Sequence, residues 1–366
     1  MVSTLIKSVA VLMLSSLSLI SHALAGDQDP VGNPVVGPGG SELTQGTAAD
    51  IKPAQPTAEE VAEVDAWLDK MSLAMHQQNF RGTLVIRQQD NLQSIRVKQG
   101  FTPEGSWQTL ESLSGEAQTI IRQNDTVTTV FPAKKLITVS GAVDAGLLGN
   151  ASGSQNKNPL HSVLPDNRQA LKAFYHLQLS GQDRVAGKNT HVLQMIPRDN
   201  HRYGYVFWLE NQSGLLLKCD LMDEQGNVVE QLMYSDIELL SETPRNNVDM
   251  AALTSYKKIN MTGESGITNQ HWYATDLPAG FSLIRSVKKG QENRPPVYHM
   301  VYSDGMASVS VFIEQRKQSD RPIVGQSTMG SVNAYSSFMD NAYVTAIGEV
   351  PVSTVQMIAQ SIRPSQ

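Results

Sequence analysis

Residues Tyr203–Gln231 read YGYVFWLENQSGLLLKCDLMDEQGNVVEQ and show most directly which fold this chain adopts. Three short runs rich in apolar residues are separated by two polar turns, which is the pattern of consecutive antiparallel β-strands. The second turn, Asp223–Asn227, contains a glycine that can take the positive φ angle of a tight hairpin. The stretch contains no histidine and no activated nucleophile motif, so it predicts a sheet that packs or binds rather than reacts.

Cys219 is the only cysteine of the chain, so no internal disulfide can form. It alternates with Leu217 and Leu221 along its predicted strand, whereas Lys218 and Asp220 face the other side. An exposed lone thiol could sense redox state or cross-link two chains, but free cysteine is among the residue types most often buried. We therefore predict that Cys219 is a small, inert core residue.

The strand pattern continues upstream of this stretch. The short β-rich segments predict an antiparallel meander, because no helical stretch between them is long enough for parallel crossovers. The expected strands are residues 80–88, 91–99, 106–113, 117–123, 126–132, 134–140, 175–185 and 189–198. The Gly- and Asn-rich residues 141–158 are expected to form a mobile loop.

Two helices are expected beside these strands. Thr57 and Glu60 have the spacing of a capping box, and the helix that follows should lie on the sheet. Its apolar residues recur at helical intervals and are Val61, Val64, Trp67, Leu68, Met71 and Met75. A second, short helical region is expected over residues 168–176, with Leu171, Phe174 and Tyr175 on its apolar side.

A smaller α+β unit is expected at the end of the chain. Residues 271–287, 296–315 and 329–350 have the alternation and turns of antiparallel strands. Ser353 is expected to cap a closing helix over residues 354–362, with Val355, Ile358 and Ile362 on one face. The polar residues 243–266 predict an irregular connector with one helical turn around residues 250–253.

The first 25 residues have the features of a cleaved export signal. Lys7 precedes the apolar run 9–20, which is shorter than the about 20 residues that a membrane span needs. Ala23-Leu24-Ala25 has the small-x-small form that signal peptidase cuts. Cleavage after Ala25 would leave glycine rather than the cysteine of a lipoprotein, so we expect a periplasmic protein.

The sequence therefore predicts five segments. These are a signal peptide (1–25), a flexible Pro/Gly-rich segment (26–56), an N-terminal domain (57–243), a linker (244–263) and a small C-terminal domain (264–366).

A search for catalytic and metal-binding motifs finds none. The histidines after the export signal lie at least ten residues apart, so the i,i+4 pairs typical of helical metal sites are absent. No G-x-S-x-G motif and no phosphate-binding glycine loop occurs. A carboxylate pair or a metal site assembled by the fold stays open, but no residue pattern favours either. We expect no enzyme and no cofactor.

Charge argues against a nucleic-acid partner. The formal net charge is −6, and acidic and basic residues balance from Glu264 onward, whereas nucleic-acid binding usually leaves a basic excess. Small basic clusters could contact phosphate or carboxylate, although solvated turns ordinarily carry such charge. These candidates are Arg184 with Lys188, Arg202 beside His201, and Lys288 and Lys289 with Arg294.

Several segments, in order along the chain, resemble the RseB/MucB family of periplasmic sigma-factor regulators. The strongest is residues 202–239, RYGYVFWLENQSGLLLKCDLMDEQGNVVEQLMYSDIEL, and others lie at residues 67–86, 112–127 and 183–199. In the second unit DLPAGF, YSDGMASVSVFIE and IGEVP carry the likeness. It covers nearly all of residues 67–362, while the segment before Pro56 and the loop around 149–158 have no counterpart.

The resemblance implies a fold and a function. The N-terminal domain would be an open antiparallel half-barrel similar to lipoprotein carriers, with helices on its concave face, followed by a small C-terminal partner-binding domain. The protein would bind the periplasmic domain of a membrane-bound anti-sigma factor (RseA/MucA-like), shield it from proteolysis, and be released by lipid or lipopolysaccharide. A periplasmic lipid or lipoprotein carrier is the alternative, and a homo-oligomer stays open.

Seven residues are candidates for an acyl-chain pocket because strand alternation places them on common faces. They are Tyr205, Phe207, Leu209, Cys219, Leu221, Leu232 and Tyr234. A half-barrel has an apolar concave face that side chains do not fill, although such stripes more often pack under helices. The protein partner is expected to contact the C-terminal domain and the linker.

Overall fold

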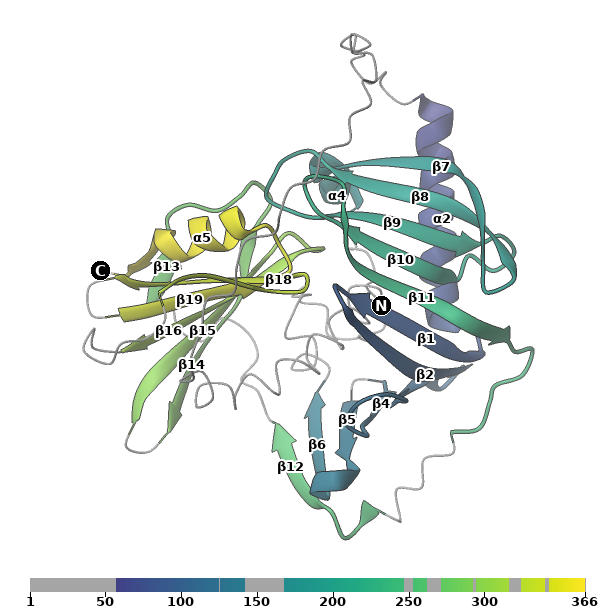
Figure 1. Cartoon of the computed structure of the whole chain (residues 1–366), viewed down its shortest axis with the longest axis horizontal. Coiled ribbons are helices and arrows are strands. Elements are labelled where there is room, and N and C mark those ends of the chain that lie inside the picture. Colours follow the sequence, from purple (N-terminus) through teal and green to yellow (C-terminus); the bar gives the residue numbers. More distant parts are fainter. Residues whose placement is uncertain are drawn as a thin grey trace, which may run out of the picture.

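The computed structural model describes residues 57–124, 126–141, 168–246, 253–261, 271–291, 294–315, 324–339 and 342–365. Two open sheets dominate the fold, and each has a helix against it (Figure 1). The large sheet has twelve strands in the order β12-β6-β5-β4-β3-β2-β1-β11-β10-β9-β8-β7, and the small sheet has six in the order β14-β15-β16-β19-β18-β17. The fold is therefore mostly β, with few helices.

The elements up to the connector are α2 (Ala58–Gln77), β1 (Phe80–Gln88), β2 (Asn91–Thr102), β3 (Gly105–Ser112), β4 (Thr119–Gln123), β5 (Thr126–Phe131), η1 (Pro132–Lys134), β6 (Leu136–Gly141), α4 (Arg168–Phe174), β7 (Tyr175–Val185), β8 (Lys188–Pro197), β9 (Gly204–Glu210), β10 (Leu216–Met222) and β11 (Val228–Leu239). The later elements are β12 (Lys257–Met261), β13 (Trp272–Ala274), β14 (Ser282–Gln291), β15 (Arg294–Ser303), β16 (Ser308–Gln315), β17 (Gly325–Met329), β18 (Val332–Met339), β19 (Ala342–Gly348), α5 (Val352–Ser361) and β20 (Ile362–Pro364).

Helix α2 begins with the predicted capping box. The Thr57 hydroxyl accepts from the Glu60 amide at 3.2 Å, and the Glu60 carboxylate accepts from the Thr57 amide at 2.7 Å. The apolar residues that follow turn to one side, where Leu68 and Met71 are fully buried in the core that β1 and β9–β11 share. The prediction that this helix lies on the sheet is confirmed.

The predicted meander is confirmed for eleven of the twelve strands of the large sheet, which pair antiparallel. Strand β1 joins the two halves of the sheet, because it pairs with β2 on one side and with β11 on the other. In the hairpin turn between β10 and β11, Gly226 has a φ of 82°, as the sequence predicted. Strands β12 and β7 form the two edges, so the sheet stays open.

The expectation of an irregular linker over residues 244–263 is wrong for its second half. Lys257–Met261 form β12, which pairs in parallel with β6. Leu253 and Tyr256 pack against the small cluster of Ile121, Val130 and Ile137 just before it. The segment is short and polar, so its own sequence does not predict a strand. It becomes one because it pairs with the open edge of β6, which lies more than a hundred residues earlier in the chain.

Two helix boundaries also differ from the prediction. Tyr175 begins β7 rather than continuing α4, because it pairs with Pro197 of β8. Helix α5 has Pro351 rather than Ser353 at its N-cap, without a side-chain cap, because the Pro351 carbonyl already accepts from the Thr354 amide. Val355 and Ile358 are buried as expected, and Ile362 is equally buried as the first residue of β20.

Helix α5 packs on β18 and β19 of the small sheet, and their apolar residues make a core separate from that of the large sheet (Figure 1). No helix in the described ranges is long and apolar enough to span a membrane. The predictions for residues 1–25, 26–56 and 142–158, and for Met250, fall outside the described residues.

Candidate functional site

The seven pocket candidates come together on one face of three adjacent strands. Cys219 of β10 lies opposite Phe207 of β9 and opposite Leu232 of β11, so these three side chains form one row across the sheet. Tyr205 and Leu221 form the row beside it, and the Tyr205 ring stacks on Phe207 at 5.7 Å between centroids. Leu209 and Tyr234 belong to the same core cluster. We call this the inner face.

The inner face is fully covered in the described structure. All seven side chains are at most 5% exposed, and Leu68, Met71 and Met75 of α2 belong to the same apolar cluster. Burial raises the pKa of the Cys219 thiol well above its ordinary value, so the thiol stays protonated and unreactive, as a core residue should. A long apolar ligand could enter here only where α2 moves away from the sheet.

The inner face ends where the large sheet meets the C-terminal domain. Glu230 of β11 is paired with Leu221 and shares a face with Leu232, and its carboxylate accepts from Ser331 of the C-terminal domain at 2.8 Å. Met306, between β15 and β16, is 1% exposed and packs in the core of the large sheet. We call these contacts between the two domains the seam.

Arg202 makes the strongest contacts of the seam. Its guanidinium pairs with Asp199 at 3.0 Å on its own domain and with Asp304 on the C-terminal domain. It also donates to the Ala279 carbonyl at 2.6 Å. Arg202 is 1% exposed, so these acceptors replace the water that a charged group otherwise needs.

Aromatic rings enclose the same guanidinium. The rings of Phe174, Tyr175 and Phe281 lie 4.7–5.7 Å from it, and cation–π attraction adds to the ion pairs. Gly280 adjoins this cluster with φ +87°, and a Cβ there would collide with the Phe174 ring. The turn that approaches Arg202 therefore needs glycine, both for its φ angle and for the close contact.

Further hydrogen bonds join the domains beside Arg202. Asn333 donates to the Tyr203 hydroxyl at 2.8 Å and to the Val350 carbonyl at 2.8 Å. The Thr354 hydroxyl donates to the His201 carbonyl at 3.0 Å. The seam is thus closed by buried polar contacts, which require a defined geometry, in addition to apolar burial.

Two family descriptions match this chain. The MucB/RseB N-terminal domain matches residues 63–252, and the MucB/RseB C-terminal domain matches residues 267–363. The chain belongs to the MucB/RseB family. The first matched range covers most of α2 and the large sheet without β12, and the second covers the small sheet with α5.

Curated relatives agree with this assignment. The chain is 28% identical to the sigma-E factor regulatory protein RseB of Haemophilus influenzae, over 84% of this chain and 93% of that protein. The identity to the sigma factor AlgU regulatory protein MucB of Pseudomonas aeruginosa is also 28%, with the same coverage. RseB of Escherichia coli K12 is 23% identical over 81% of this chain.

Solved MucB structures have the same fold. The complex of Pseudomonas aeruginosa MucA and MucB matches with a TM-score of 0.64 and 26% identity, covering 83% of this chain and 99% of that chain. MucB in complex with MucA(peri) gives a TM-score of 0.61 at 25% identity, and the crystal structure of MucB gives a TM-score of 0.56 at 26% identity. The likeness extends over both domains.

The basic candidates of this MucB/RseB chain do not form one site. Arg202 is buried in the seam rather than exposed in a solvated turn, because Asp304 and the Ala279 carbonyl of the C-terminal domain pair with it. Arg184 is exposed, Lys188 is half-buried, and Lys288 lies 5.7 Å over the Tyr298 ring. Lys289 and Arg294 lie near the turn that joins β14 to β15, and their side chains fall outside the described part.

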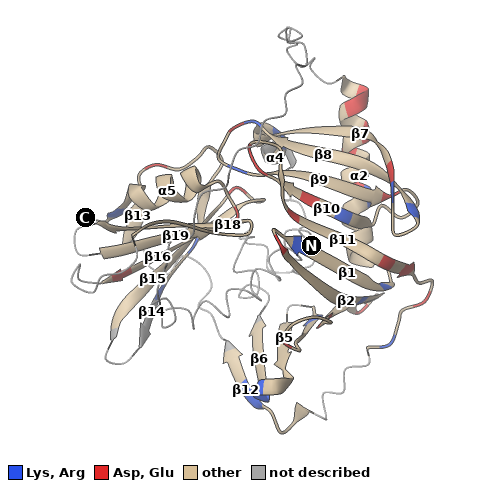
Figure 2. Ribbon diagram, in the orientation of Figure 1, with Lys and Arg blue, Asp and Glu red and all other residues tan. Residues whose placement is uncertain are grey.

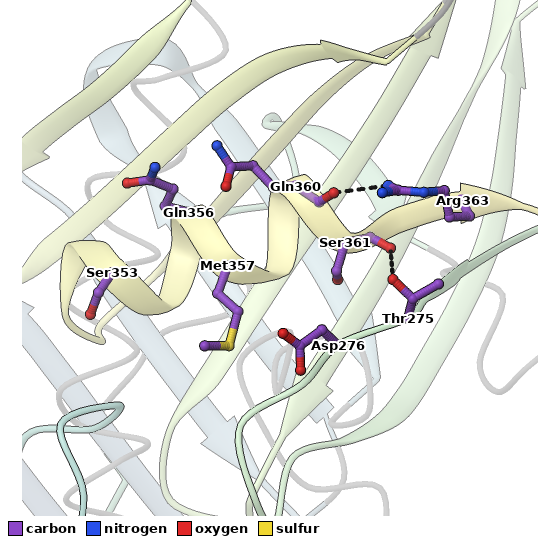
Figure 3. Close-up of a pocket in the computed structure, with 8 residues that line it drawn as sticks. All are labelled: Thr275, Asp276, Ser353, Gln356, Met357, Gln360, Ser361 and Arg363. Carbon is purple, nitrogen blue, oxygen red and sulfur yellow. Dashed lines mark hydrogen bonds between the residues drawn. The ribbon is translucent and has the colours of Figure 1, made fainter.

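A shallow groove runs along the outer side of α5 (Figure 3). Gln356, Met357 and Gln360 of the helix form one wall, and Thr275 and Asp276 form the other. Ser353, Ser361 and Arg363 complete its lining. The groove is open and mixed in polarity, which suits an extended peptide better than an enclosed small molecule.

Charged residues are scattered along both sheets, with one basic group at the far edge of the large sheet (Figure 2). This group is Lys134, Lys135, Lys257 and Lys258, brought together by the pairing of β12 with β6. Lys134 is paired with Glu116 at 3.0 Å. No group of three or more metal-binding side chains occurs among the residues that the structure describes.

Sequence reasoning missed the seam. Asp304, Ser331 and Asn333 lie about 100 residues or more from the residues they contact, and none belongs to a local motif. One residue in the sequence of β11 does indicate a buried polar contact. Glu230 occupies a position where strand alternation predicts an apolar residue.

Proposed function

We propose that this chain is a periplasmic negative regulator of an envelope-stress sigma factor. It binds the periplasmic part of a membrane-bound anti-sigma factor and shields that part from proteolysis. The observation that carries the proposal is the likeness, over 83% of this chain and both of its domains, to MucB in a complex with MucA. The names of its relatives, which are sigma-factor regulatory proteins, support the same role.

The test is co-purification with the periplasmic segment of a membrane-bound anti-sigma factor from the same organism. We expect a complex at micromolar concentrations and slower cleavage of the segment by protease when the complex forms. No complex, or cleavage at an unchanged rate, contradicts the proposal.

We place the partner on the C-terminal domain, with the α5 groove as the contact. A positive charge in its wall should disrupt an extended peptide, so Met357→Arg should weaken binding of the segment at least tenfold. Gln326→Arg is the matched control, because Gln326 is exposed on the edge strand β17 and lies outside the groove. Equal binding of both variants would exclude the groove.

We propose that the large sheet is a half-barrel whose concave side is the inner face, and that lipid or lipopolysaccharide enters there and releases the partner. The apolar composition of the inner face and its cover by α2 support this. Phe207→Asp should weaken the lipid response, whereas Val206→Asp, on the other face of the same strand, should have less effect. A thermal melt must accompany both, because a buried charge destabilises the fold.

The alternative is a periplasmic lipid or lipoprotein carrier that uses the inner face without a regulatory role. Deleting residues 264–366 does not separate the two functions cleanly, because Met306 packs in the core of the large sheet. The point variant Met357→Arg separates them better. If the protein is a carrier, the Met357→Arg variant should still bind lipid, and the unchanged protein should not bind the anti-sigma segment.

We propose that export removes residues 1–25 and that the N-terminal domain extends through β12 to Met261, beyond the boundary expected from the sequence. The intact mass of the protein isolated from the periplasm tests the cleavage site. It should correspond to a chain that begins at Gly26, and retention of the first 25 residues would contradict it.

A further inference from the structure

Two glutamates from different domains meet at one serine hydroxyl in the seam. Glu230 comes from β11, Ser331 from the turn between β17 and β18, and Glu349 from the segment between β19 and α5. The Ser331 hydroxyl oxygen lies 2.8 Å from a carboxyl oxygen of Glu230 and 3.2 Å from one of Glu349. Glu230 and Ser331 are at most 1% exposed.

One hydroxyl cannot satisfy two carboxylates. Ser331 has a single proton, so it can donate to only one of its two neighbours. The other contact is a hydrogen bond only when that carboxyl is protonated and donates to the hydroxyl oxygen. With both glutamates ionised, two negative charges would lie beside the same hydroxyl group. A proton on Glu230 removes this repulsion.

The surroundings of Glu230 favour that proton. Gln88 donates to the same carboxyl oxygen at 2.6 Å, whereas the other oxygen is buried and has no hydrogen-bond partner among the described residues. Burial raises the pKa of Glu230, and the hydrogen bonds from Gln88 and Ser331 oppose this effect without cancelling it. A neutral carboxylic acid is the form that such a site accommodates best.

Among the residues that the structure describes, no cation forms an ion pair with Glu230. The titratable and charged groups around it are Glu349, Tyr203, Tyr205, Cys219, Asp223, Glu224, His201, Asp199, Asp304, Arg202, Lys218 and Asp220. Of the two cations, Arg202 pairs with Asp199 and Asp304, and Lys218 pairs with Asp220 on the other face of β10. His201, whose ring lies 3.5 Å from the Thr354 hydroxyl, also belongs to the seam and needs a control variant.

We propose that Glu230, Ser331 and Glu349 form a proton-dependent latch that holds the two domains together. The proton comes from solvent, is held while the domains are closed, and returns to solvent when they part. Because Glu230 shares a face with Leu232, opening the latch also uncovers this end of the inner face. The latch goes beyond the proposed function and does not depend on it.

The sign of the pH effect follows from the position of Glu230. Its pKa is raised in the closed arrangement and returns toward the ordinary value when water reaches it. Closure therefore binds a proton, is favoured at low pH, and is lost as the pH rises through the closed-state pKa. Between the two pKa values, the ratio of closed to open molecules falls by up to about tenfold for each pH unit.

Fluorescence energy transfer between the domains measures this ratio. Dyes on Gln182→Cys and Ser327→Cys report on the large and the small sheet, since both positions are exposed, and Cys219→Ala in the background leaves no other thiol. The wild-type seam in this background should show high transfer at pH 4.5, near the ordinary pKa of a glutamate, and falling transfer as the pH rises toward 8.5. Transfer that does not change over this range would overturn the proposal.

Three variants identify the group responsible. Glu230→Gln is neutral at every pH and should stay closed at pH 8.5, and Glu349→Gln, which removes the opposing charge, should flatten the pH dependence as well. His201→Asn should keep the wild-type pH dependence. If Glu230→Gln and Glu349→Gln both retain the wild-type curve, or if His201→Asn abolishes it, the latch is not built from these carboxyls. Circular dichroism at each pH verifies that every variant is folded.

Discussion

Arg202 occupies a position where its charge has no access to water, and six neighbouring groups compensate for it. Two carboxylates and a carbonyl accept its hydrogen bonds, and three aromatic rings pack around the guanidinium. Such an arrangement stabilises the closed seam only while every partner is present, because a buried charge without its partner is costly.

Arg202→Met should destabilise the protein by about 3–5 kcal/mol, because Asp304 would stay buried without its cation. Chemical denaturation followed by circular dichroism measures the free energy of unfolding. Arg184→Met is the matched control, since Arg184 is exposed and should change that free energy by less than about 0.5 kcal/mol. Equal losses in both variants would contradict the role given to Arg202.

Cys219 should be unreactive in the folded protein. Its sulfur is buried and the pKa of its thiol is raised, so neither access nor thiolate favours reaction. A coloured thiol reagent should label it at least a hundredfold more slowly in buffer than in denaturant. Rapid labelling of the native protein would show that the inner face opens readily.

At the scale of single elements, α2 and β12 form for different reasons. Helix α2 has a capping box and an apolar stripe in its own sequence, so local signals are sufficient to place it. Strand β12 has neither, and it forms because β6 offers an unpaired edge. The first element is local in origin and the second depends on the completed sheet.

Thr57→Ala should cost about 1 kcal/mol, because the amide of Glu60 loses its acceptor at the first turn of α2. Glu59→Ala is the matched control, since Glu59 lies in the same turn and makes none of the capping contacts. Thermal unfolding followed by circular dichroism measures both. A smaller loss for Thr57→Ala than for Glu59→Ala would count against the cap.

At the scale of the whole molecule, the two domains are joined through the core as well as through polar contacts. Met306 belongs in sequence to the hairpin of β15 and β16 but packs with the apolar residues of the large sheet. The N-terminal domain therefore depends on the C-terminal domain to complete its core.

Met306→Ala should destabilise the protein by about 2–5 kcal/mol, through the lost burial and the cavity that remains. Hydrogen exchange should show faster exchange in β9–β11 as well as in the hairpin that carries the substitution. Met329→Ala is the control, because Met329 is 44% exposed on the edge strand β17. Effects confined to the small sheet would contradict a shared core.

The sequence alone predicted most of the elements and the family. The turn at Asp223–Asn227, the strands around Cys219 and the start of α2 are encoded by residues close together in the chain, where turn chemistry, alternation and capping act locally. The pocket candidates were placed on one face by the same alternation, although their role in lipid binding stays a prediction.

Only the tertiary structure decided what Arg202, Glu230 and residues 257–261 do. A charged side chain in a turn or strand carries no local sign of a partner on another domain, and here Asp304 and Ser331 lie about 100 residues from Arg202 and Glu230. Whether these side chains are buried, and which groups compensate their charge, depends on which surfaces of the two domains pack together. Those surfaces exist only after both sheets have formed, so local sequence encodes the strands and the packed domains determine the seam.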